Sequence, residues 1–173
     1  HKVKDDFIKD ETRFHHIGRD DRLPKDIVDQ LHDMEKSTEK FSKLHALLCM
    51  DYGGRDEIVR AVNSVIDAGV AEVTEETFSD YLDTAGIPDP DLIIRTSGEK
   101  RTSGLMPYQA TYAELYFTNV PFPEFDGEEF KRAVLEYSHR TRRFGGTVGE
   151  EMKNIDEKEL TEPQKDGSDP VEG

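Results

Sequence analysis

A dense group of hydrogen-bond donors follows an apolar run near the middle of the chain, in the segment IIRTSGEKRTSG at residues 93–104. The segment offers the guanidinium groups of Arg95 and Arg101 and the hydroxyl groups of Thr102 and Ser103. Guanidinium presents paired N–H donors that match phosphate oxygens, and the two glycines add exposed backbone N–H groups. The segment therefore indicates a diphosphate site. An exposed polar loop with ordinary surface arginines is an equally weighted alternative.

A carboxylate, Glu114, opens the apolar segment TYAELYF at residues 111–117. Burial of a carboxylate costs free energy unless the group is paired, protonated or bound to a metal. Mg²⁺ is usually held by one or two carboxylates together with phosphate oxygens, so Glu114 suits a magnesium site beside a diphosphate. A salt bridge between Glu114 and an arginine explains its position equally well.

Two glycine-containing segments each allow a structural and a functional interpretation. RRFGG at residues 142–146 ends a predicted helix, where arginines complement the negative pole and Gly145 stops the helix. That capping role is a sufficient explanation by itself. YGGR at residues 52–55 lies at a predicted strand-to-helix turn, which is usually structural but can also approach an anion.

The elements that must position these groups can be predicted from hydrophobic periodicity. Short apolar runs predict four strands, at residues 13–17, 44–50, 92–95 and 114–118. We expect the second strand to be buried and Cys49 within it to be a buried thiol. The loop that carries Arg95 and Arg101 follows the carboxyl end of the third strand, where open α/β sheets bind their ligands.

Helices are predicted between the strands from apolar residues that recur every three or four positions. Thr74 and Asp126 are the predicted N-caps of two of these helices, and the one that begins at Thr74 is expected to reach Ala85. The inward-facing stripes are predicted to be Ile27, Leu31, Met34, Thr38 and Phe41; then Ile58, Val62, Val65 and Ile66; and last Phe130, Ala133, Val134 and Tyr137. This alternation predicts an α/β domain with a largely parallel sheet flanked by helices.

Composition narrows the class of protein. The chain has 173 residues, enough for one domain, and 23 basic against 38 acidic side chains give a net charge of −15. Such an acidic chain is not expected to bind nucleic acid. No apolar run is long enough to span a bilayer, and we expect a cytoplasmic protein. The last residues, 148–173, are acidic and are predicted to form a disordered tail.

Several of these segments, in the same order, resemble the cis-prenyltransferase family, the undecaprenyl diphosphate synthase-like isoprenyl transferases. The resemblance extends from about residue 17 to residue 147 and rests most specifically on the pair IIRTSGEKR and YAELYF. The other matching segments are IGRDDRLP at 17–24, DYGGRDEI at 51–58, FPEF at 122–125 and RRFGG at 142–146.

The resemblance implies an enzyme that condenses isopentenyl diphosphate onto an allylic diphosphate, such as farnesyl or geranylgeranyl diphosphate, to give a long-chain polyprenyl diphosphate. It implies that Arg95, Arg101, Thr102 and Ser103 contact isopentenyl diphosphate and that Glu114 binds Mg²⁺. It further implies a homodimer in which Arg143 and Gly145 reach a partner's active site, and peripheral membrane association through the lipid product.

This chain departs from the family pattern in three places. Lys100 stands where some members have histidine, and Asp51 where asparagine is common. The third departure is larger, because the family's N-terminal phosphate-binding loop with its catalytic aspartate does not occur in this sequence. We therefore expect residues 1–147 to be the C-terminal portion of one cis-prenyltransferase domain, without the N-terminal strands, and prenyl transfer by this chain alone to be undetectable.

Two other classes of protein fit parts of the same pattern. One is a non-catalytic partner subunit of a heterodimeric prenyltransferase, although such subunits usually lose the arginines that correspond to Arg95 and Arg101. The other is an anion-binding structural module, which would not prefer isopentenyl diphosphate over inorganic pyrophosphate.

Overall fold

The structure is a computed structural model that describes residues 2–140. The chain divides into a compact unit, residues 1–139, and a second unit, residues 140–173. The predicted domain boundary near residue 147 and the predicted acidic tail lie outside the described residues.

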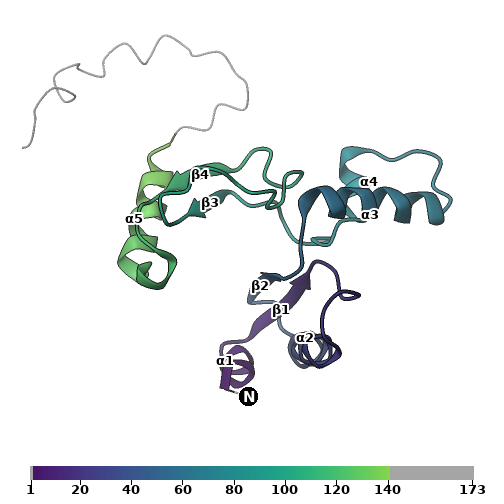
Figure 1. Ribbon diagram of the computed structural model, residues 1–173, viewed down its shortest axis with the longest axis horizontal. Helices are drawn as coiled ribbons and strands as arrows, with labels where there is room; N and C mark the ends of the chain where they lie inside the picture. Colours follow the sequence, from purple (N-terminus) through teal and green to yellow (C-terminus); the bar gives the residue numbers. More distant parts are fainter. Residues whose placement is uncertain (1, 141–173) are drawn as a thin grey trace, which may run out of the picture. The chain divides into compact units, whose positions relative to one another are not determined.

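Helices and strands alternate in the first half of the first unit, and after it two helices and then two strands follow one another (Figure 1). In chain order the elements are α1 (Lys2–Lys9), β1 (Thr12–Ile17), α2 (Lys25–Thr38), β2 (Leu44–Cys49), α3 (Gly54–Asp67), α4 (Glu75–Ser79), β3 (Leu92–Arg95), β4 (Glu114–Phe117), the short 3₁₀ helix η1 (Phe122–Glu124) and α5 (Gly127–Ser138). The four predicted strands are thus confirmed, each within a residue or two of its expected ends.

The described strands form two parallel pairs. β1 pairs with β2 from Thr12 opposite Leu44 to Ile17 opposite Cys49, and β3 pairs with β4 from Leu92 opposite Glu114. We expected one largely parallel sheet; the strands are parallel, but no ladder joins β2 to β3 within the described residues. The connection from β1 to β2 is helical, whereas residues 96–113 between β3 and β4 form a long irregular loop.

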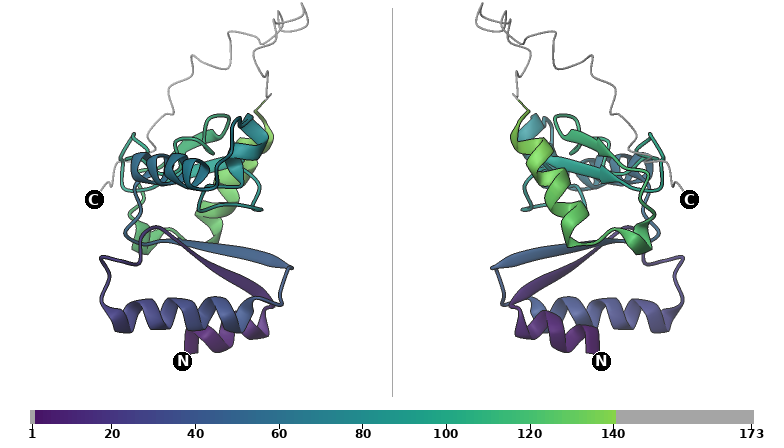
Figure 2. Two further views of the ribbon diagram at one scale, coloured as in Figure 1. Left: turned by 90° about the vertical axis from the view of Figure 1, so that its right-hand side faces the viewer. Right: turned by 90° about the vertical axis from the view of Figure 1, so that its left-hand side faces the viewer.

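Helix α2 lies against β1, as its predicted apolar stripe requires. Leu31 and Thr38 are its buried residues. The Thr38 hydroxyl donates to the carbonyl oxygen of Met34 at 2.8 Å and accepts the N–H of Phe14 on β1 at 3.0 Å. Figure 2 shows α1 and α2 on the same side of the β1–β2 pair, where both contact β1.

Burial of the other apolar segments differs from the prediction. In β2, Leu44 is 59% exposed and Cys49 is exposed, so the expectation of a buried strand with a buried thiol is wrong. The physical reason is that α1 and α2 pack mainly against β1. An apolar run predicts a strand, but its burial depends on which elements cover it.

The predicted inward faces of two helices are also largely wrong. In α3 the buried residues are Gly54, Glu57 and Ala61, whereas Val62 and Ile66 of the predicted stripe are exposed. In α5 only Ala133 of the predicted stripe is buried. Its stripe partners Phe130 and Val134 are exposed.

Both predicted N-caps are confirmed. The Thr74 hydroxyl accepts the N–H of Thr77 at 3.3 Å in a reciprocal capping box, and the Asp126 carboxylate accepts the N–H groups of Glu128 and Glu129, each at 3.0 Å. The helix that begins after Thr74 is shorter than expected and ends at Ser79, because turns follow it up to Gly86. None of the helices in the described part of the chain is long and apolar enough to cross a membrane.

Candidate diphosphate-binding site

The loop that follows β3 begins with a turn that is hydrogen-bonded to the segment after β4. The N–H of Ser97 donates to the carbonyl oxygen of Val120 at 2.9 Å, and the N–H of Gly98 donates to that of Thr118 at 2.9 Å. Ser97 and Gly98 both have left-handed backbone angles, with φ of 64° and 71°. We expected the backbone N–H groups of the two glycines to serve as anion donors, but that of Gly98 already binds a carbonyl oxygen.

The far end of the same loop is held by the first turn of α3. The N–H of Gly54 donates to the carbonyl oxygen of Gly104 at 3.1 Å. A Cβ atom at Gly54 would lie only 2.0 Å from Cδ of Pro107, so no side chain fits there without displacing that segment. The YGGR turn and the loop that follows β3, residues 96–104, are therefore neighbours in space. We call this loop the donor-rich loop.

The predicted substrate-binding residues of this region lie beside and between these two attachments. Arg95 ends β3 and is half-buried, whereas Thr102 and Ser103 are exposed. The Arg101 side chain is 66% exposed and forms an ion pair with the Glu99 carboxylate. Four of the predicted substrate-binding residues thus lie at the carboxyl end of β3 or on the loop that follows it, as the sequence predicted.

The predicted magnesium ligand lies elsewhere on the strand pair. Glu114 is half-buried at the amino end of β4, opposite Leu92, whereas Arg95 lies opposite Phe117 at the carboxyl end. Three residues of a strand separate the two registers by about 10 Å along the strand direction. Within residues 2–140, no group of three or more His, Cys, Asp and Glu side chains is arranged to hold a metal ion. Arg143 and Gly145 lie outside the described residues.

Asp51, one of the departures from the family pattern, has a defined role before α3. It adopts a left-handed conformation with φ of 51°, which asparagine and aspartate accept more readily than other side chains. Its carboxylate accepts two hydrogen bonds from the guanidinium group of Arg22, each at 2.7 Å. The chain therefore fixes the turn with an ion pair.

A buried carboxylate that the sequence analysis missed supports the same region. Glu57 on α3 is 1% exposed and accepts hydrogen bonds from the Tyr52 hydroxyl, the N–H of Asp83 at 2.9 Å and Nε2 of Gln109 at 3.1 Å. Burial, together with the bond to Glu57, raises the pKa of Tyr52 well above its usual range. The sequence carries one weak signal for this role, the helical spacing of four between Glu57 and the buried Ala61.

Ion pairs connect α3 to the ends of other elements. The Arg60 guanidinium donates to both carboxylate oxygens of Asp83 at 2.7 Å, and Asp83 also accepts the N–H of Gly18 after β1 at 3.0 Å. Hydrogen bonds from Arg60 and Arg19 lower the pKa of Asp56 in the first turn of α3. The helix that holds the loop is thus itself fixed at several points.

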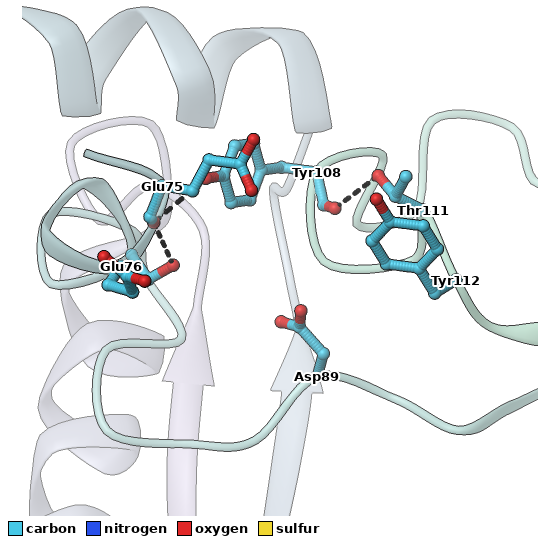
Figure 3. Close-up of a pocket in the computed structure, with 7 residues that line it drawn as sticks. Glu75, Glu76, Asp89, Tyr108, Thr111 and Tyr112 are labelled. Atoms are coloured by element: carbon cyan, nitrogen blue, oxygen red, sulfur yellow. Dashed lines mark hydrogen bonds between the residues drawn. The ribbon is translucent and has the colours of Figure 1, made fainter. Parts of the chain in front are cut away.

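A separate pocket of about 340 Å³ lies beside α4 (Figure 3). Its lining residues are Glu75, Glu76, Ser79, Asp89, Tyr108, Thr111 and Tyr112. Three carboxylates around one space disfavour an anion, so this pocket does not suit a diphosphate. It includes none of the predicted substrate-binding residues.

A known protein family matches most of this chain. The sequence profile described as "Putative undecaprenyl diphosphate synthase" matches residues 1–145. The chain belongs to the undecaprenyl diphosphate synthase family. The resemblance stated from the sequence is therefore confirmed.

Members of the undecaprenyl diphosphate synthase family share substantial identity with the chain. An isoprenyl transferase of Aquifex pyrophilus is 44% identical over 147 residues, which are 85% of this chain and 64% of the relative. A tritrans,polycis-undecaprenyl-diphosphate synthase (geranylgeranyl-diphosphate specific) of Thermoplasma volcanium is 39% identical over 160 residues, a match that covers 84% of this chain and 62% of the relative. The chain thus spans less than two thirds of the length of these relatives.

Solved structures of the family show the same fold. A probable undecaprenyl diphosphate synthase from Campylobacter jejuni matches with a TM-score of 0.76 and 35% identity, over 83% of this chain and 68% of that one. Lavandulyl diphosphate synthase from Lavandula x intermedia, solved with dimethylallyl diphosphate, matches with a TM-score of 0.72 and 31% identity, over 83% and 69%. The predicted α/β fold of the undecaprenyl diphosphate synthase type is confirmed.

Proposed function

We propose that this chain is part of a cis-prenyltransferase that condenses isopentenyl diphosphate onto an allylic diphosphate to give a long-chain polyprenyl diphosphate. Family membership supports the reaction class. The observation that carries the proposal for this chain is the loop after β3, which is attached at Gly98 and Gly104 and presents two guanidinium groups between or beside these attachments.

In this proposal the loop binds the diphosphate of isopentenyl diphosphate. Arg95 and Arg101 supply paired N–H donors and positive charge, and Thr102 and Ser103 supply hydroxyl donors. Binding the charged end of the substrate fixes the position of its double bond relative to the allylic partner, which lowers the entropic part of the barrier. The diphosphate that the loop holds stays in the product, because the group that leaves is the diphosphate of the allylic partner.

Magnesium is the proposed cofactor, and Glu114 is its candidate ligand in the described residues. Its carboxylate is the hard oxygen donor that Mg²⁺ prefers, and Mg²⁺ commonly completes its shell with water and phosphate oxygens. With a single candidate carboxylate, whose register lies about 10 Å along the strand direction from that of Arg95, the fit depends on substrate oxygens that reach from the loop towards Glu114. When bound, the ion would neutralise diphosphate charge.

A homodimer is the proposed assembly, with Arg143 and Gly145 contributing to a partner's site. Exposed apolar side chains on and around β4 and α5 support an interface there. They are Leu115, Phe117, Phe122, Phe130, Val134 and Leu135. The proposed allylic substrate is farnesyl or geranylgeranyl diphosphate; the name of the Thermoplasma volcanium relative, which is geranylgeranyl-diphosphate specific, supports the latter.

Calorimetric titration of isopentenyl diphosphate into the 173-residue chain tests the proposed site. We expect Arg101→Gln to weaken binding by about tenfold or more, since a hydrogen bond to a charged group contributes about 1.5–3 kcal/mol. Arg132→Gln is the matched control, because Arg132 has the same 66% exposure and also pairs with a nearby carboxylate, that of Glu129. We expect this control to bind like the wild type.

Two outcomes would contradict the proposal. Equal affinity for isopentenyl diphosphate and inorganic pyrophosphate would indicate a plain anion-binding module. Equal losses in Arg101→Gln and Arg132→Gln would show that overall charge, and not the loop, governs binding. Mass spectrometry of products formed from isopentenyl and geranylgeranyl diphosphates with Mg²⁺ tests the separate expectation that this chain alone makes no long products.

A further inference from the structure

In the donor-rich loop, the carboxylate of Glu99 is paired with Arg101, the arginine that the proposed site needs for its ligand. Glu99 and Arg101 form an ion pair, with side chains that are 39% and 66% exposed. Since both groups are open to solvent, the pair can separate when a ligand arrives. A carboxylate and a phosphate oxygen are acceptors for the same fork of guanidinium N–H donors.

We propose that Glu99 is an internal counter-anion that binds Arg101 until a diphosphate displaces it. This inference rests on the proposed function of the loop and concerns how strongly that loop selects its ligand. A ligand with a single negative charge gains little by replacing a carboxylate that is already in place. A diphosphate carries several negative charges and competes more effectively.

The hydrogen bonds at the two ends of the loop restrict the distance between the competing carboxylate and Arg101. The N–H of Gly98 is bound to the carbonyl oxygen of Thr118, and the carbonyl oxygen of Gly104 accepts the N–H of Gly54. Glu99 and Arg101 lie between these fixed points, with one residue between them. The short span keeps Glu99 near Arg101 in the absence of a ligand, so the carboxylate acts at a high effective concentration.

Loss of this competitor has an effect of predictable size. Exposed ion pairs are weak, so release of Arg101 from Glu99 strengthens anion binding by about two- to fivefold. Removal of one negative charge beside a polyanion adds to that gain. We therefore expect Glu99→Gln to bind inorganic pyrophosphate about three to ten times more tightly than the wild type.

The experiment is calorimetric titration of inorganic pyrophosphate into the 173-residue chain at one low ionic strength. Glu72→Gln is the matched control, because it removes the same charge from an exposed position in the segment before α4. We expect its affinity to stay within about twofold of the wild type. Glu99→Gln in an Arg101→Gln background should show only the smaller gain from the removed charge, since no guanidinium is left to release.

Each outcome decides one question. If Glu99→Gln binds pyrophosphate no more tightly than the wild type, Glu99 is not a competitor and this inference is overturned, while the proposed function stands. If the whole gain persists in the Arg101→Gln background, Glu99 acts through general charge alone and the inference is equally overturned. If the wild-type chain binds neither pyrophosphate nor isopentenyl diphosphate, the proposed function falls and this inference with it.

Discussion

The side-chain amide of Gln109 donates to both carboxylate oxygens of Glu57, at 3.1 and 3.2 Å, and so joins α3 to the segment that follows the donor-rich loop. The same amide nitrogen lies 3.0 Å from the hydroxyl oxygen of Thr84. Both Gln109 and Glu57 are buried, and the carboxylate is satisfied by neutral donors from three different segments. This contact joins the segment after the loop to the same helix, α3, that binds the loop at Gly104.

Glu57→Ala is expected to destabilise the chain strongly. The substitution leaves the Tyr52 hydroxyl, the N–H of Asp83 and the amide of Gln109 without their shared acceptor. Each unsatisfied buried donor costs about 1–3 kcal/mol, so we expect a loss of about 3 kcal/mol or more in the free energy of unfolding. Urea denaturation measures it, with the exposed Glu72→Ala as the control; equal stability of the two variants would contradict the role of Glu57.

Gly54→Ala is expected to disturb the attachment of the loop to α3. A Cβ atom at this position would lie 2.0 Å from Cδ of Pro107 and 2.6 Å from the carbonyl oxygen of Gly104. Overpacking of this kind costs about 1–3 kcal/mol. We expect a lower melting temperature and weaker pyrophosphate binding, because Gly104 ends the loop.

Gly127→Ala is the matched control for that substitution. Gly127 is also the first residue of a helix, α5, but no atom lies within 4 Å of a Cβ built there. We expect its stability to equal or slightly exceed that of the wild type. If Gly54→Ala and Gly127→Ala behave alike, crowding against Pro107 does not matter.

Acid is expected to destabilise the chain through His15. Its imidazole stacks on that of His45, with ring centroids 5.1 Å apart, and burial together with Arg13 and His45 lowers the pKa of His15. The unfolded chain therefore binds this proton more readily than the folded chain, so stability falls as the pH drops below about 6.5 and is regained as the pH rises. His15→Gln should flatten this dependence in urea denaturation at pH 5.5 and 7.5, whereas His139→Gln should not.

Cys49 is expected to react slowly with thiol reagents in the folded chain. The residue is exposed at the end of β2, but partial desolvation of its sulfur and the carboxylates of Glu57 and Asp83 raise the pKa of the thiol. Because the thiolate is the nucleophile, the reaction with a disulfide reagent at pH 8 should accelerate when the chain is unfolded in urea. Equal rates in the folded and unfolded chain would contradict a raised pKa.

Local signals in the sequence determined much of this protein. The run from Leu92 to Arg95 gave the bounds of β3 without error, and the side chains of Thr74 and Asp126 predicted two caps that the structure contains. These features depend on a few adjacent residues, so short-range chemistry is enough to predict them. The donor-rich loop was found for the same reason, since its arginines and hydroxyls are close in sequence.

Tertiary structure alone decided which surfaces are buried and how the loop is attached. Periodicity shows that Val62 and Phe130 each lie on the apolar face of a helix. Only packing decides whether another element covers that face, and both residues are exposed. Burial of Glu57 depends on donors from Asp83 and Gln109, which lie 26 and 52 residues away. Contacts at such separations leave no periodic pattern in the sequence.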